Sequence, residues 1–390
     1  MVLFCFISLC SVLGAEGDTI RWAYDGNWNA LNDYLYAEYY REAIKQGDGS
    51  YIATDYYITG EKQMVGKYTN ASMTVRTGDF KYFHKNGELS RKGAFKGNLE
   101  TGEWLSYHDN GQMLSKGNYK GGKREGEWIW YYKDGDLSEK GNYLAGNRIG
   151  EWIAYGDSLG KEVFKGNYEK DVLTGKFYKW HANGQLAQEG TYLKGKREGS
   201  YSFYFDNGQK GEEFFYLKGK RTGHWKSWYK DGSLEFEGDF VKDKKEGEWK
   251  YFFESGKIAS KETYKKGANV DLFFWDEDGK EVNDEDRLYR QATPKGGESR
   301  LYDHIEKELE YPLYALNRGI MGLIIVKATI TVEGELINPY VSLPGHPCLN
   351  EEALRLVKGV ENWTPQISHN RPKESEVSIP ITFRLNLNQE

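Results

Sequence analysis

The sequence is poor in cysteine and proline and carries little net charge, and each shortage excludes a class of protein. Its three cysteines are Cys5 and Cys10 in an apolar N-terminal segment and Cys348 near the other end, so a framework of internal disulfides is excluded. Eight prolines beside 46 glycines fit neither a collagen-like nor a disordered chain. A formal charge of −6 lacks the basic excess that is typical of nucleic-acid-binding proteins. Aromatic residues, at 15% of the total, and glycine favour strands and turns instead.

Long apolar runs are also scarce, and the one at the N-terminus predicts export. Residues 1–15, MVLFCFISLCSVLGA, are apolar throughout, but they are fewer than the roughly 20 residues that cross a bilayer. We interpret them as the apolar region of a secretory signal peptide, cleaved after Gly14 or Ala15. The positive residues that usually precede such a region are missing, which leaves a start further upstream or a buried N-terminal strand as alternatives.

One glycine recurs through the middle of the chain with a spacing of 24 residues and a single step of 25. It stands at Gly78, Gly102, Gly126, Gly150, Gly175, Gly199, Gly223 and Gly247. Two and five positions after each glycine, the residue is aromatic in all eight copies. The first aromatic column is Phe80, Trp104, Trp128, Trp152, Phe177, Tyr201, Trp225 and Trp249, and the second is Phe83, Tyr107, Tyr131, Tyr155, Trp180, Tyr204, Trp228 and Phe252.

Each copy is predicted to form one β-hairpin. A turn pair such as Asp134-Gly135 follows the second aromatic column, and such pairs tolerate the positive φ angles of tight hairpin turns. A second strand then ends in another aromatic residue such as Tyr143. Because a lone hairpin is marginally stable in water, the copies must stack and bury their aromatic columns against one another. The predicted fold is therefore mainly β, an elongated array of 24-residue hairpins.

The repeat also resembles a known family. The pattern GEWxxYYxxG, then an apolar residue, GxY and a lysine-rich turn, resembles the MORN-variant repeat of proteins that are often labelled YwqK-family antitoxins. We expect these repeats over residues 54–280, with Thr54–Tyr68 as a first copy and Asp271–Gly279 as a degenerate last half. Residues 16–53 are expected to cap the array. Within that cap, residues 34–42 could form either a helix or an irregular strand.

Three histidines share one position of the repeat. Equivalent positions of adjacent repeats lie about 10 Å apart, which is too far for two rings to share a zinc ion bonded at ~2.0 to 2.1 Å. We therefore interpret His84, His108 and His181 as substitutes for Tyr132 and Tyr229, which occupy the same position in other copies.

The second turn of most repeats is basic. Its residues include Lys120, Lys123 and Arg124; Arg148; Lys194, Lys196 and Arg197; Lys218, Lys220 and Arg221; and Lys242, Lys244 and Lys245. Such a row could attract anionic lipid or an acidic glycan. Glutamates such as Glu125 and Glu198 stand beside it, however, and charged turns also protect sheet edges from aggregation. We favour a solvated edge, with a weak contact to anionic lipid or glycan as the alternative.

The aromatic columns are interpreted as the core of a thin sheet, with a face that binds sugar rings or partner side chains as the alternative. The residues in question are Trp104, Tyr107, Trp128, Tyr131, Trp152, Tyr155, Trp225, Trp228 and Trp249. No Ser/His/Asp set, Cys/His pair or phosphate-binding loop appears at a meaningful spacing. We therefore predict no enzyme, no metal site, no cofactor and no small-molecule substrate.

The repeat pattern stops after Gly279. Residues 281–293 are predicted to be a polar linker and residues 294–390 a small α+β domain. The expected elements are a helix over Asp303–Glu310, a second helix between Pro312 and Gly319, a hairpin of residues 324–332 and 336–343, and a helix capped by Asn350. The last strand places Val377, Ile379, Ile381, Phe383, Leu385 and Leu387 on one face. Because Pro380 cannot donate to a ladder, this strand should lie at an edge or carry a bulge.

The motifs of this segment closely resemble the TonB C-terminal domain. They are PKGGE from Pro294, YPxxA from Tyr311, LNEEALR from Leu349, WTP from Trp363 and PITFRL from Pro380. The resemblance implies a periplasmic location in a Gram-negative cell and a last strand that pairs with a segment of a partner, such as an outer-membrane transporter or another envelope protein. The partner-binding edge strand would then comprise Val377, Ile379, Pro380, Ile381, Phe383 and Leu385, because an exposed edge can add an extended peptide.

These observations predict a non-enzymatic periplasmic interaction protein, in which the repeats form a scaffold and the C-terminal domain binds a partner by strand addition. Two alternatives stay open. A TonB-like energy transducer that supports outer-membrane transport would need a membrane-spanning N-terminal helix, which the short leader does not supply. An antitoxin or immunity protein rests on the label of the repeat family.

Overall fold

A computed structural model describes residues 14–16, 19–32, 35–156, 160–282 and 287–385. Most of the predicted signal peptide, residues 1–13, lies outside the described residues, and so does Leu387. The chain divides into two compact units, Met1–Lys220 and Arg221–Glu390. It forms a long antiparallel sheet of hairpins and a small C-terminal α+β region, which confirms the predicted fold class. Within the described ranges, no helix has the length and apolarity needed to cross a membrane.

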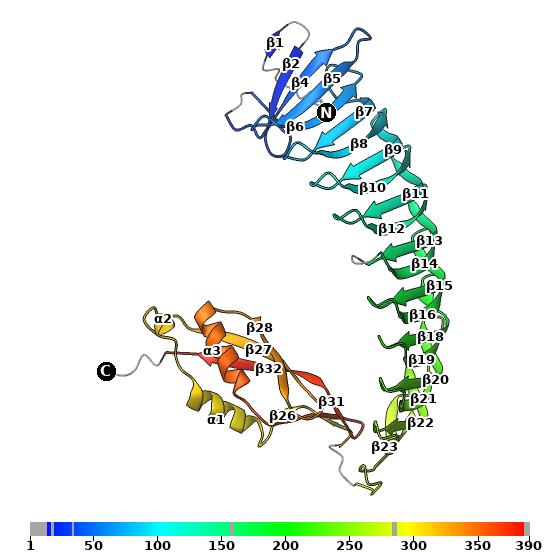
Figure 1. Ribbon diagram of the computed structural model, residues 1–390, viewed down its shortest axis with the longest axis vertical. Helices are drawn as coiled ribbons and strands as arrows, with labels where there is room; N and C mark the ends of the chain where they lie inside the picture. Colours follow the sequence, from blue (N-terminus) through cyan, green and yellow to red (C-terminus); the bar gives the residue numbers. More distant parts are fainter. Residues whose placement is uncertain (1–13, 17–18, 33–34, 157–159, 283–286, 386–390) are drawn as a thin grey trace, which may run out of the picture. The chain divides into compact units, whose positions relative to one another are not determined.

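The first unit consists of antiparallel strands that pair mainly with their neighbours in sequence (Figure 1). Strand β2 pairs with β1, β3 and β4, and from β4 onward each hairpin pairs with the next. The strands are β1 (Gly14–Glu16), β2 (Thr19–Tyr24), β3 (Ala30–Leu31), β4 (Tyr39–Lys45), β5 (Tyr51–Tyr57), β6 (Lys62–Tyr68), β7 (Arg76–Phe83), β8 (Leu89–Lys96), β9 (Leu99–Tyr107), β10 (Met113–Lys120), β11 (Lys123–Tyr131), β12 (Leu137–Leu144), β13 (Asn147–Tyr155), β14 (Glu162–Glu169), β15 (Val172–Trp180), β16 (Leu186–Leu193), β17 (Lys196–Arg197), β18 (Gly199–Tyr204) and β19 (Lys210–Leu217). Of the two alternatives for residues 34–42, the structure has a strand from Tyr39 onward, where β4 begins, and no helix over residues 35–42; residue 34 lies outside the described residues.

The glycine that opens each repeat lies at a bulge in mid-strand. In all eight copies its φ is between 65° and 76°, in the left-handed region that favours glycine. The register shows why: Gly117 faces Trp128, but the next residue, Asn118, faces Glu125, so Gly126 and Glu127 are skipped. The 24-residue spacing of this glycine therefore reflects a backbone requirement inside the strand.

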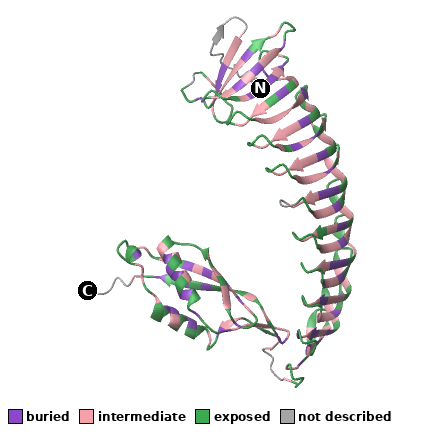
Figure 2. Cartoon of the chain, viewed as in Figure 1, coloured by how far each residue is buried: buried purple, intermediate pink, exposed green. Residues whose placement is uncertain are grey.

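A second glycine column makes room for the first aromatic column. Gly117 pairs with Trp104 on one side and Trp128 on the other, and a Cβ atom at Gly117 would lie 2.2 Å from the Trp128 indole. The same close approach joins Gly93 to Trp104, Gly141 to Trp152 and Gly238 to Trp249. Because the rings lie directly on the backbone of the neighbouring strand, Trp104 and Trp152 are each 1% exposed. Figure 2 shows buried residues recurring along the successive hairpins.

The second unit contains the last repeats and the C-terminal domain. Its elements are β20 (Lys220–Trp228), β21 (Leu234–Val241), β22 (Lys244–Phe252), β23 (Ile258–Lys265), β24 (Ala268–Phe274), β25 (Tyr289–Arg290), β26 (Thr293–Pro294), α1 (Glu298–Glu308), α2 (Leu313–Leu316), β27 (Gly322–Ile330), β28 (Leu336–Leu343), α3 (Pro347–Lys358), β29 (Trp363–Thr364), β30 (Gln366–Ser368), β31 (Arg371–Lys373) and β32 (Ser375–Phe383). The core of the C-terminal domain lies between α3 and the sheet β28-β27-β32, where Leu349, Leu356, Ile324, Val326 and Ile381 are buried together.

Two predicted helix boundaries in this domain are wrong. Helix α1 begins at Glu298 rather than Asp303, because Gly296 and Gly297, at φ 100° and 89°, end the preceding segment there. Helix α3 begins at Pro347 with His346 as its N-cap, so Asn350 lies inside the helix. The Asn350 side chain instead accepts a hydrogen bond from the Gly345 amide at 2.8 Å.

Candidate partner-binding strand and its junction with the repeats

Strand β32 lies at one edge of the three-stranded sheet, as Pro380 predicted. It pairs antiparallel with β27 over its whole length, from Ser375 opposite Ile330 to Phe383 opposite Gly322. The sheet order β28-β27-β32 places no other described strand beside it. The backbone groups on its outer side are therefore available to pair with an added strand.

The two faces of β32 have different roles. Ile379, Ile381 and Phe383 are 2%, 1% and 1% exposed and pack in the core, and Val377 packs against it. The alternate residues Glu376, Ser378, Pro380 and Thr382 are exposed. Of the six residues predicted to bind a partner, these four apolar side chains are thus directed into the domain itself. The strand ends at Phe383, so the predicted site residue Leu385 lies beyond it.

The position of Pro380 defines which backbone groups face outward. Pro380 is opposite Ile325 in the register. Since proline has no amide hydrogen, the ladder stays unbroken only if this is a non-hydrogen-bonded pair. The alternation of an antiparallel ladder then directs the amides of Glu376, Ser378 and Thr382 to the open edge. A strand added at this edge would find three donors, two before Pro380 and one after it.

A cavity of about 340 Å³ borders the first half of the same strand. Its lining includes Ser375–Pro380 on one side and, on the other, Gln291–Pro294 and the α1 residues Leu301 and Tyr302. The predicted linker thus contributes to this wall, and its residues Tyr289 and Arg290 form β25. The strand therefore has a recess beside it as well as an open edge.

A short hairpin leads directly into β32 and docks on the last repeats. We call β30 and β31, residues 366–373, the docking hairpin. Its two turn residues, His369 and Asn370, have φ values of 53° and 62°, as a two-residue hairpin turn requires. Asn370 is 3% exposed, and its side chain donates to the carbonyl oxygens of Ala259 at 2.8 Å and Trp275 at 2.6 Å. The turn is thereby fixed on the backbone of the last hairpin of the array.

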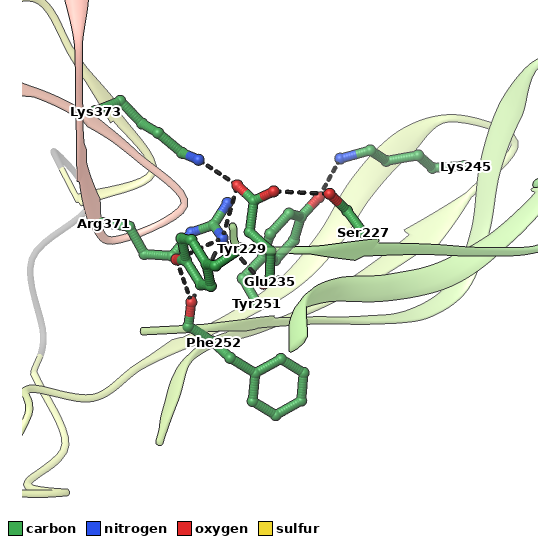
Figure 3. A network of polar contacts seen from close by, with 8 residues as sticks. All are labelled: Ser227, Tyr229, Glu235, Lys245, Tyr251, Phe252, Arg371 and Lys373. Atoms are coloured by element: carbon green, nitrogen blue, oxygen red, sulfur yellow. Dashed lines mark hydrogen bonds and ion pairs between the residues drawn. The ribbon is translucent and has the colours of Figure 1, made fainter. Parts of the chain in front are cut away.

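Glu235, on β21, holds the second strand of the docking hairpin (Figure 3). Its carboxylate pairs with Lys373 and with Arg371 at 3.3 Å, and it accepts a hydrogen bond from Ser227 at 2.7 Å. Burial raises the pKa of Glu235, but the two cations and the hydroxyl outweigh burial and bring the pKa below its ordinary value. Arg371, 3% exposed, also donates to the carbonyl oxygen of Glu235 at 2.9 Å.

Glu262, on β23, binds the turn of the docking hairpin. It is completely buried and accepts hydrogen bonds from His369 at 2.6 Å, Tyr264 at 2.6 Å and Ser260 at 2.9 Å. Burial raises the pKa of Glu262, yet these bonds outweigh it and the pKa lies below its ordinary value. Burial lowers the pKa of His369 despite the bond to Glu262. The pair is therefore a carboxylate that accepts from a neutral imidazole.

Sequence reasoning missed this junction, although the repeat carried a signal for it. Glu262 stands at the place of the second glycine column, 24 residues after Gly238. At Gly238 the absence of a side chain makes room for the indole of Trp249 on the following strand. At Glu262 the following strand is β24, and the residue paired with Glu262 there is Leu272. No tryptophan of a following strand lies opposite position 262, so glycine is not required there and a buried carboxylate occupies the position.

The other predicted site residues have mainly structural contacts. In the first aromatic column, Trp104, Trp128, Trp152 and Trp249 are buried and Trp225 is half-buried. In the second column, Tyr107, Tyr131, Tyr155 and Trp228 are half-buried. The Nε2 atoms of His84, His108 and His181 lie 2.9, 3.0 and 2.8 Å from the carbonyl oxygens of Tyr107, Tyr131 and Tyr204. The Tyr132 and Tyr229 hydroxyls donate to the equivalent carbonyl oxygens of Tyr155 and Phe252, both at 2.7 Å, so histidine does substitute for tyrosine here.

The glutamates of the basic turns also have defined partners. Glu125 accepts from the amide of Ala145 at 2.9 Å, Glu198 from that of Lys218 at 2.6 Å, and Glu246 from that of Lys266 at 2.7 Å. Each carboxylate thus stabilises the turn of the following repeat.

Comparison with known families matches both parts of the chain. The MORN repeat variant matches residues 100–120, 124–145, 173–194, 221–242 and 245–266, and the Gram-negative bacterial TonB protein C-terminal domain matches residues 307–385. Both predicted resemblances are confirmed. The second match associates the chain with the cell envelope and with protein partners.

No curated protein matches the chain. Among solved structures, similarity was found to "Crystal Structure of TcdB2-TccC3" and to the same complex without its hypervariable C-terminal region. Each match is 11% identical, covers 61% of this chain and 16% of that chain, and has a TM-score of 0.15.

Proposed function

We propose that this protein is a non-enzymatic interaction protein of the Gram-negative periplasm, exported by its N-terminal leader. The C-terminal domain binds an extended segment of an envelope protein, which adds to the outer edge of β32. The repeats form the scaffold on which this domain is held.

The single observation that carries the proposal is the open edge of β32 in a domain of the TonB C-terminal family. The apolar side chains of β32 pack in the core, so a partner is recognised through the backbone and through the exposed side chains of Ser378 and Thr382. The recess of about 340 Å³ beside Ser375–Pro380 offers space for side chains of the added segment. The docking hairpin supports a scaffold role for the repeats, because it joins the last hairpins to the start of this strand.

Photo-cross-linking in the native cell tests this function. A photoreactive amino acid in place of Thr382, which is exposed, should cross-link to one discrete envelope protein. Ser378→Pro removes an outward amide and should reduce the cross-linked product severalfold, whereas Ser378→Ala keeps the amide and should not. A photoreactive group at Glu351, exposed on α3, serves as the site control. Equal yields from the proline and alanine variants would contradict strand addition.

A further inference from the structure

A cavity of about 320 Å³ lies between the last repeats and the docking hairpin. Five aromatic rings, four cationic side chains and three further residues line it: Trp225, Phe236, Phe240, Trp249 and Tyr251; Arg221, Lys245, Arg371 and Lys373; and Glu235, Ser368 and His369. A ring-lined cavity of this size with a few converging charged groups is typical of a small-molecule site. The strand-addition site makes no use of it.

The charges around this cavity are not balanced. Among the described lining residues Glu235 is the one carboxylate, and it is already bonded to Arg371 and Lys373. Outside the lining, Asp243 lies 3.4 Å from Arg221, and Glu262 is bonded to His369. Four cations are thus set against three carboxylates, of which two lie outside the cavity. An additional negative charge would be attracted here.

Of the four cations, Lys245 is the one whose positive charge is least compensated by neighbouring groups. Its Nζ atom lies 4.5 Å from the centroid of the Trp249 ring and donates to the Tyr251 hydroxyl. Burial lowers the pKa of Lys245 to about 8, and repulsion from Arg371 and Arg221 adds to the effect of burial, while Glu262 acts against it. A buried ammonium group in this environment gains from an anionic neighbour.

Arg371 provides a second, independent observation. The side chain is buried, and its Nε atom has no hydrogen-bond acceptor among the described residues. A buried donor without an acceptor is unfavourable. The cavity wall therefore carries an excess of positive charge, and Arg371, one of the residues that line it, has an unused donor.

We propose that this cavity binds a small aromatic carboxylic acid, with its ring against Trp225 and Phe236 and its carboxylate among Lys245, Arg371 and Arg221. The rings supply a flat apolar surface and the cations supply charge complementarity. Because the repeats and the docking hairpin both contribute walls, the bound acid connects the two and stabilises the docked hairpin. The inference is independent of strand addition at β32.

Isothermal titration calorimetry on the full chain tests the site with two matched probes. Indole-3-acetate should bind at one site, and indole-3-acetamide, which has the same ring but no charge, should bind at least tenfold more weakly. This comparison needs only the unaltered protein. Equal affinity for the two probes, or no measurable binding of either, would overturn the proposal.

Two variants locate the binding. Lys245→Met keeps the aliphatic stem and removes the charge, and it should weaken indole-3-acetate at least tenfold. Lys244→Met, at an exposed neighbour on the same strand, should leave the affinity unchanged. Unchanged affinity in a folded Lys245→Met protein would place the probe elsewhere and refute the assignment. Should that variant fail to fold, Arg221→Gln supplies the same comparison.

Discussion

The imidazole of His369 lies flat on the phenol ring of Tyr251, with ring centroids 3.8 Å apart and planes 5° from parallel. The same imidazole is hydrogen-bonded to the buried Glu262. A residue of the C-terminal domain is thereby held between two strands of the repeats, β22 and β23. Since the docking hairpin runs into β32, the contact places the candidate partner-binding strand at a defined position relative to the last hairpins.

Glu262→Gln should release the docking hairpin. Three donors converge on this carboxylate, and an amide offers them only one oxygen. We expect the free energy that stabilises the docked state to fall by about 1 to 3 kcal/mol. The change should be visible as faster amide hydrogen exchange at His369 and Asn370. Glu254→Gln, at an exposed position of the adjacent turn, is the control. Unchanged exchange in the Glu262 variant would show that the turn is held without this carboxylate.

Docking of the hairpin should weaken in mild acid. The pKa of His369 lies below its ordinary 6.5, so its contribution to docking is complete above pH 6.5 and is lost as the pH falls through its lowered pKa. The pKa of Glu262 lies below its ordinary 4.5, and its contribution is lost in the same direction at lower pH. Lys245, with a pKa of about 8, stays charged below pH 7.

Hydrogen exchange of the docking hairpin at pH 7.5 and pH 5.5, corrected for the intrinsic exchange rate, measures this effect. Protection of the Asn370 amide should be lower at pH 5.5 than at pH 7.5. The His369→Gln variant should remove most of this difference between the two pH values. Protection that rises in acid would mean that the imidazolium form is favoured in the docked state.

Local patterns in the sequence were enough to predict the repeats and the edge strand. The turn pair Asp134-Gly135 and the aromatic residues beside it are determined by neighbours within one hairpin. Pro380 likewise predicts an edge from its own missing amide. Glu262 and His369 are 107 residues apart, and nothing local indicates that they meet. The departure of Glu262 from the second glycine column was an available signal, and its meaning depended on knowing that a tryptophan or another aromatic ring lies against each glycine of that column.

Helix starts were predicted less well, for a related reason. Asn350 is a favourable N-cap by residue type, but the chain already turns into the helix at Pro347, where the fixed φ of proline suits the first position. Several residues compete for each cap, and the choice depends on how the rest of α3 packs, with Leu349 and Ala353 buried against the sheet.

Gly117→Ala should destabilise the repeats although it adds a single methyl group. The new Cβ atom would lie 2.2 Å from the Trp128 indole, so either the ring or the strand must move. Overpacking of this kind costs about 1 to 3 kcal/mol, which thermal unfolding monitored by tryptophan fluorescence will detect. Asn118→Ala, at the exposed next position, should change the unfolding free energy by less than about 0.5 kcal/mol. Similar effects of the two variants would argue against the glycine–indole contact.

His108 should be replaceable by tyrosine but not by leucine. Its Nε2 atom lies 3.0 Å from the carbonyl oxygen of Tyr131, and the Tyr132 hydroxyl makes the equivalent bond one repeat later. His108→Tyr should therefore leave the unfolding temperature unchanged. His108→Leu should lower the free energy of unfolding by about 1 kcal/mol, because leucine cannot form the hydrogen bond. Zinc ions should alter none of these temperatures if the histidine acts only through this bond. A zinc-dependent rise in the unaltered protein that His108→Tyr abolishes would instead identify His108 as a metal ligand.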